Sequence, residues 1–134
     1  MINEFFAVTM TSVYHVYVSD EKAAVAQKIG QRSGVGSSIE VGAVLNNCVN
    51  VAITKTGLQA FRPWNGERDP AQIQSTRYLG SHTSAIVALF LSKARAMECF
   101  ATGELVQRDA RFAKETNAVL AAIGRDHPVF CVCA

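Results

Sequence analysis

The clearest periodic pattern of hydrophobic positions lies between Asp109 and Gly124. Side chains suited to a buried helical stripe recur there three or four positions apart, at Phe112, Thr116, Val119, Leu120 and Ile123. This spacing places them on one side of a helix. Because Asp109 is a good N-cap and Gly124 follows the stripe, the pattern predicts a helix between them.

A buried strand and a second helix are predicted before this segment, and another strand after it. Residues 84–91 form a short apolar run, and Ser92 can cap a helix that ends at Gly103. Residues 129–133 are apolar without polar alternation, which is typical of a strand covered on both faces. The helices between these two strands predict a parallel, right-handed β-α-α-β crossover.

The first third of the chain mixes strand and helix signals. Residues 5–18 are rich in β-branched and aromatic types and predict one long strand. Both faces of that strand carry large apolar groups, so it needs cover on both sides. Ser19 is a capping residue, the alanine-rich stretch up to Lys28 favours a helix, and Gly30 ends it.

The middle of the chain predicts an antiparallel meander. Its three short strands are expected at residues 38–45, 48–54 and 58–62. Asn46–Asn47 and Thr56–Gly57 suit the turns between them. A short helix is expected over residues 70–79, after Asp69 and Pro70.

These elements predict an α+β fold with a mixed, mainly antiparallel sheet and helices packed on one face. The chain has 134 residues, which favours one domain over residues 1–134. Hydrophobic residues make up 49% and charged residues 18%, so intrinsic disorder is not expected.

The overall charge argues against two classes of partner. Lys and Arg number 13 and Asp and Glu 11, a net charge of +2, too small for charge alone to indicate nucleic-acid or membrane binding. No apolar run approaches the ~20 residues of a membrane span. The first basic residue is Lys22, so a positively charged signal-peptide start is not expected.

Four cysteines, Cys48, Cys99, Cys131 and Cys133, do not form the spacing of a zinc ribbon or a disulfide framework. Reduced thiols are therefore expected, which favours a reducing compartment. We expect a cytoplasmic protein that needs no cofactor.

The segment before residue 84 holds one candidate catalytic or ligand-binding site. It brings together a cation, a phenol, an imidazole and hydroxyls, at Arg77, Tyr78, Ser81, His82 and Thr83. His82 could serve as a general base and Arg77 could bind an anionic group. Small polar residues are also ordinary loop constituents.

A second candidate site surrounds the one tryptophan. Trp64 lies between Arg62 and Arg68, and Trp and Arg are enriched among binding hot spots. This loop is a candidate surface for a protein partner. The alternative is that Trp64 folds back and covers the sheet.

Two further groups carry weaker signals. His127, Cys131 and Cys133 share one parity and are weak candidates for a zinc site, although their spacing is poor and free cysteines are usually buried. Basic residues also begin both C-terminal helices, among them Arg95 and Arg111, where acidic neighbours favour a solvated mixed-charge face. His15 is expected to be a hydrogen-bonded histidine within a strand.

The sequence therefore favours a small non-catalytic binding or interaction module that acts as a homodimer, with nucleic acid and membrane not expected as partners. The apolar first strand and the low charge content support this interpretation. The alternative is a small enzyme or ligand-binding protein with its site around Arg77, Tyr78 and His82.

Overall fold

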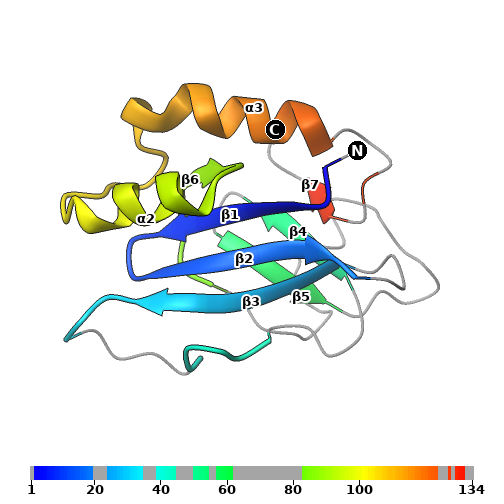
Figure 1. Ribbon diagram of the computed structural model, residues 1–134, viewed down its shortest axis with the longest axis horizontal. Coiled ribbons are helices and arrows are strands. Elements are labelled where there is room, and N and C mark those ends of the chain that lie inside the picture. Colours follow the sequence, from blue (N-terminus) through cyan, green and yellow to red (C-terminus); the bar gives the residue numbers. More distant parts are fainter. Residues whose placement is uncertain are drawn as a thin grey trace.

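Two β-sheets and two α-helices make up the described part of the chain, which is an α+β arrangement (Figure 1). The computed structural model describes residues 2–19, 24–34, 39–44, 50–54, 57–61, 83–123, 127 and 129–131. The predicted strand at 84–91 is confirmed as β6, and the predicted hairpin of the meander is confirmed as β4 and β5. The helix expected over 70–79 lies outside the described residues.

The first sheet, sheet A, is antiparallel throughout and has the strand order β3-β2-β1-β6. Its strands are β1 (Glu4–Thr9), β2 (Ser12–Val18), β3 (Ala24–Gln31) and β6 (Ile86–Phe90). The second sheet, sheet B, has the order β5-β4-β7. Its strands are β4 (Asn50–Thr54), β5 (Gly57–Phe61) and β7 (Val129–Cys131), and β7 is parallel to β4.

The prediction of one long strand over residues 5–18 was wrong. The chain reverses at Met10 and Thr11, so the segment forms the β1–β2 hairpin. Thr9 explains the reversal, because its Oγ1 accepts hydrogen bonds from the backbone N–H groups of Thr11 and Ser12 at 3.2 and 2.9 Å. Threonine and serine side chains that bind nearby backbone groups favour turns over continued strands.

The helix predicted after Ser19 was also wrong, because residues 24–31 form strand β3. Ala24, Ala26 and Lys28 are buried, and the residues between them are half-buried. This alternation is the strand period, and pairing with β2 outweighs the helix propensity of the alanines.

The strand predicted over residues 38–45 is not formed in its described part. Residues 39–44 contain a turn in which Ala43 N–H donates to Glu40 C=O at 3.0 Å. Gly42 has a φ of +94°, which glycine adopts readily. The segment pairs with β3 through an isolated bridge between Val44 and Gln27 and through hydrogen bonds to Lys28, without forming a strand.

Both helices and their caps match the predictions. Helix α2 (Lys93–Ala101) begins after Ser92, whose side chain accepts from Arg95 N–H. The 3-10 turn η2 (Ala110–Phe112) is capped by Asp109 and continues into α3 (Ala113–Ile123). Neither α-helix in the described residues is long and apolar enough to cross a membrane.

The predicted packing of both helices on one face is not confirmed, because α2 and α3 contribute to different hydrophobic clusters. Ala96 and Cys99 of α2 pack in the cluster that contains Phe90, whereas Val119 and Ile123 of α3 pack in the cluster that contains its neighbour Leu89. Successive residues of a strand point to opposite faces. The hydrophobic groups of β1 are therefore covered on both faces within one chain.

The predicted β-α-α-β crossover does not form within one sheet. Strand β6 pairs with β1 in sheet A, whereas β7 pairs with β4 in sheet B. Later segments of the same chain form hydrogen bonds with the backbone groups along the outer edge of β6. Arg108 and Asp109 N–H groups donate to its carbonyls, and Leu89 N–H donates to Thr116 Oγ1 at 3.1 Å.

Candidate interaction surface

One face of sheet A carries a group of side chains of which α2 covers only part, since Phe6 packs in the cluster of Ala96 and Cys99. Strand register places Glu4 opposite Tyr17 and Tyr17 opposite Val25 in one row. The adjacent row runs from Phe6 through His15 and Gln27 to Val44. We call this surface the open face, and it consists of Glu4, Phe6, His15, Tyr17, Val25, Gln27 and Val44.

An aromatic stack forms the centre of the open face. The rings of Phe6 and His15 are parallel to within 10° with centroids 4.8 Å apart, and Tyr17 lies 4.8 Å from His15 on the next row. His15 Nε2 lies 2.7 Å from Glu4 Oε2. As predicted, His15 lies in a strand and its ring is hydrogen-bonded.

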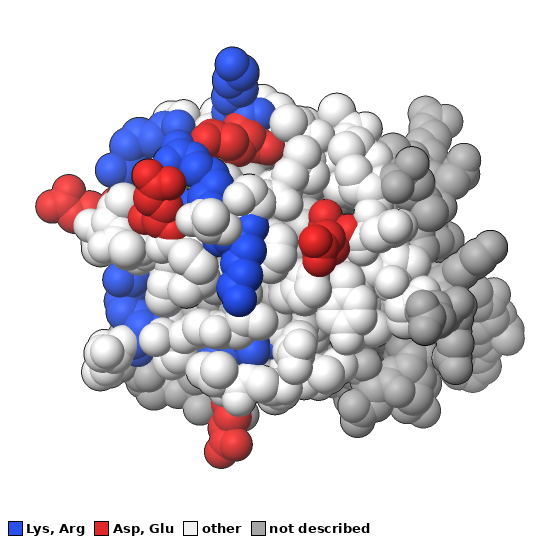
Figure 2. Space-filling view, in the orientation of Figure 1, with Lys and Arg blue, Asp and Glu red and all other residues white. Residues whose placement is uncertain are grey.

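The open face is partly accessible and carries little charge. Phe6 is buried, His15, Tyr17, Val25 and Gln27 are half-buried, and Val44 is 41% exposed. Strands β2 and β3 run across the front of the view, and neither of the two described α-helices lies over them (Figure 1). In the same orientation, many charged side chains gather at the helical end, and one basic and one acidic side chain also lie in the middle of the view (Figure 2).

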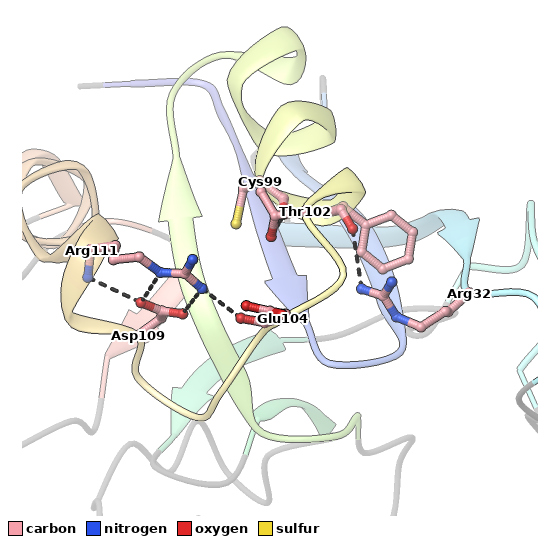
Figure 3. A network of polar contacts seen from close by, with 7 residues as sticks. Arg32, Cys99, Thr102, Glu104, Asp109 and Arg111 are labelled. Carbon is pink, nitrogen blue, oxygen red and sulfur yellow. Dashed lines mark hydrogen bonds and ion pairs between the residues drawn. The ribbon is translucent and has the colours of Figure 1, made fainter.

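A second polar cluster lies at the helical end of the molecule (Figure 3). The guanidinium group of Arg111 donates two hydrogen bonds to the carboxylate of Asp109, at 2.9 Å from Nε to Oδ1 and at 2.6 Å from Nη2 to Oδ2. The hydrogen bonds from Arg111 lower the pKa of Asp109 to about 2. Arg95 Nε donates to Glu115 at 2.9 Å. The predicted mixed-charge face is therefore confirmed for Arg95 and Arg111.

Cys99 lies beside this cluster but is not a reactive thiol. It is 1% exposed, and burial raises its pKa to about 11. A thiol is a good nucleophile only as a thiolate, so this site holds Cys99 in its unreactive form. The sulfur therefore acts as part of the hydrophobic cluster under α2.

Lys28 is a buried cation that the sequence did not single out. It lies opposite Tyr14 in the β2–β3 ladder, on the face of sheet A away from the open face. Its Nζ donates to Ile39 C=O at 2.6 Å, and burial lowers its pKa. Its backbone N–H and C=O bind Ala43 and Gly42. Lys28 therefore fastens residues 39–44 along the outer edge of β3.

Three of the residues predicted from the sequence as site members lie in the described part of the chain. Thr83 is buried, and its hydroxyl donates to Ser84 C=O at 2.8 Å. His127 is 2% exposed; its Nδ1 accepts from Val129 N–H at 3.0 Å and its Nε2 lies 2.8 Å from Ile2 C=O. Both ring nitrogens of His127 are thus hydrogen-bonded, Nδ1 to its near neighbour Val129 and Nε2 to Ile2, 125 positions away. Cys131 is the last residue of β7.

The other predicted site residues lie outside the described residues, and they comprise Arg62, Trp64, Arg68, Arg77, Tyr78, Ser81, His82 and Cys133. The enzyme or ligand site around Arg77, Tyr78 and His82 therefore stays a prediction. Within the described ranges, no three His, Cys, Asp or Glu side chains are grouped in a way that could hold a metal ion.

No protein family, curated protein or solved structure matches this chain. Its function must therefore be inferred from its own residues.

The register of sheet A could not be read from the sequence, because residues 24–31 gave a helical signal. His15 and Tyr17, which lie two positions apart and so share one face of a strand, were the available signal for the open face.

Proposed function

We propose that this chain is a small, non-catalytic interaction module of the cytoplasm that acts as a homodimer. The observation that carries the proposal is the open face, where no helix of the described residues covers Tyr17, Val25 and Val44. Aromatic and aliphatic groups at such a surface gain free energy when a partner removes them from water.

The sheet edges favour association through a face over association through a strand. A sheet recruits another strand where its edge offers unpaired backbone groups. Backbone groups at the outer edge of β6 are already hydrogen-bonded to Arg108, Asp109 and Thr116. On β3, the backbone N–H and C=O groups of Lys28 are already hydrogen-bonded to Ala43 and Gly42. Strand addition at these positions would first require the chain's own segments to leave.

The charge of the open face favours a protein surface of low charge as its partner. Nucleic acid binding relies on Lys and Arg at the phosphates, and neither residue type occurs among the open-face residues. The one carboxylate, on Glu4, is already bound by His15. Free, buried Cys99 is in keeping with a reducing compartment.

Sedimentation velocity and native mass spectrometry of the purified chain test the proposal. We expect a dimer at micromolar concentrations that dissociates on dilution. A protein that remains a monomer up to the highest soluble concentration would contradict the homodimer. Retention of a small organic molecule would instead favour the enzyme or ligand-binding alternative.

A further inference from the structure

We infer that residues 104–109 form a strap that covers the outer edge of β6 and prevents a second copy of that strand from pairing there, and that Arg111 holds the strap in place (Figure 3). The strap lies at the edge of sheet A, whereas the proposed homodimer would form through the open face. Its role is therefore independent of the homodimer.

Strand β6 has the composition of a segment that pairs with itself when it is uncovered. Its residues 86–90 read IVALF, with no charge, proline or glycine, and all five are buried. Among the described strands, β6 pairs with β1 on one side and ends sheet A on the other. Short uncharged strands rich in β-branched and aromatic residues pair readily with copies of themselves at such an edge. A second β6 is therefore the partner that this edge needs protection from.

The strap supplies hydrogen bonds to this edge without forming a strand. The Arg108 N–H donates to Ile86 C=O at 3.3 Å, and the Asp109 N–H donates to Val87 C=O at 3.1 Å. Arg108 has a φ of +52°, a left-handed conformation that is strained for arginine and persists where the surrounding structure holds it. Because this residue interrupts the extended backbone, the strap offers no regular edge to which a further strand could add.

Arg111 holds the strap at both ends (Figure 3). Its Nη2 donates to Glu104 C=O at the start of the strap, and its guanidinium binds both carboxylate oxygens of Asp109 at the end. Two-pronged bonds between arginine and a carboxylate are stronger and more directional than bonds between neutral groups. The Asp109 side chain is buried, so loss of Arg111 would leave a buried carboxylate without its cation.

Apolar contacts contribute little to holding the strap. Of residues 104–108, Leu105 is buried and the other four are exposed. Leu105 packs in the same cluster as Phe112, whereas the next residue, Val106, is 59% exposed. Apolar burial thus attaches the strap at one residue, and polar contacts such as those of Arg111 must hold the remainder against the strain at Arg108.

Two substitutions of Arg111 and one matched control test this arrangement. Arg111→Ala removes every side-chain contact to the strap. Arg111→Lys keeps the charge but loses the planar fork that reaches both carboxylate oxygens. Lys114→Ala removes an exposed cation from the start of α3, close in sequence to Arg111. Amide hydrogen exchange at Arg108 and Asp109 measures opening of the strap, and thioflavin T fluorescence measures assembly through paired strands.

We expect exchange at Arg108 and Asp109 to accelerate ~10-fold or more in both Arg111 variants, while the amides of β2 keep their protection. Both variants should then form thioflavin-positive assemblies, whereas Lys114→Ala and the unmodified chain should not. If Arg111→Ala does not fold, as judged by circular dichroism, Arg111→Lys decides the question.

The two parts of the inference fail separately. Unchanged exchange at the strap in a folded variant, or loss of protection in β2 at the same rate, would overturn Arg111 as the residue that holds the strap. A strap that opens without assembly would overturn its protective role at β6. Assemblies in which no β6 amide gains protection would overturn that role as well.

Discussion

The hydrogen bond from Leu89 to Thr116 allows a sharp test of how the edge of sheet A is closed. Leu89 is 1% exposed, and its N–H points to Thr116 Oγ1 at 3.1 Å. Thr116→Val keeps the shape of the side chain and removes the acceptor. A buried N–H left without a partner costs about 1–3 kcal/mol. The added methyl group recovers up to about 0.8 kcal/mol.

The net loss in the free energy of unfolding should therefore be about 1–2 kcal/mol. For a domain of this length, that corresponds to a decrease in Tm of about 3–7 °C. Thr116→Ser is the matched control, because it keeps the hydroxyl and loses only a methyl group. Urea unfolding measures the stability, and amide hydrogen exchange measures the protection of Leu89.

We expect Thr116→Val to lose exchange protection at Leu89 and Thr116→Ser to retain it. Equal stability and equal Leu89 protection in Thr116→Val and the unmodified chain would refute the reasoning. The Leu89 N–H would then have another acceptor, and α3 would contribute to sheet A through hydrophobic packing alone.

Three further predictions concern other parts of the chain. Gly57→Ala should destabilise by about 2–4 kcal/mol in urea unfolding, because its φ is +143° and a Cβ would lie 2.5 Å from Ser84 O. Gly103→Ala, where φ is +80° and no atom lies within 4 Å, should cost only about 1 kcal/mol. An equal cost for both substitutions would exclude the clash as the cause. Cys99, with its pKa raised to about 11, should resist alkylation at neutral pH until the chain is unfolded, as read by peptide mass spectrometry; rapid labelling of the folded chain would contradict its burial. Because folding lowers the pKa of Asp109 to about 2, its stabilising effect should be complete above its ordinary pKa of 3.8 and vanish as the pH falls through 2. The difference in urea midpoint between Asp109→Asn and the unmodified chain should shrink over that range, and a constant difference would show that the carboxylate charge does not matter.

The elements that could be predicted from the sequence are those whose signals are local. Ser92 and Asp109 cap their helices as predicted, because a capping side chain binds a backbone group two or three residues away. In the stripe from Phe112 to Ile123, the residues Phe112, Val119 and Ile123 are buried, as the helical spacing predicted. Such interactions need no knowledge of distant parts of the chain.

The elements that were missed depend on distant partners. Ala24 and Ala26 favour a helix in isolation, and only pairing with β2 makes them a strand. The open face depends on register in the same way, since Glu4 and His15 are 11 positions apart in the chain. Tyr17 and Val44 reach one surface only after β2, β3 and the 39–44 segment have come together.

His127 ties the ends of the described chain together, and this has a consequence for how the protein folds during synthesis. Its ring binds Ile2 C=O across 125 positions, and β6 pairs with β1 across most of the same interval. The β1–β2–β3 ladder joins neighbouring segments and can form as soon as it leaves the ribosome. Sheet A must then wait with β1 uncovered until residues 86–90 are made, and the contact to Ile2 must wait until residue 127 emerges. A nascent chain paused before residues 86–90 are made would leave Phe5 and Ala7 without the hydrophobic groups that cover them, and such exposed surface promotes aggregation.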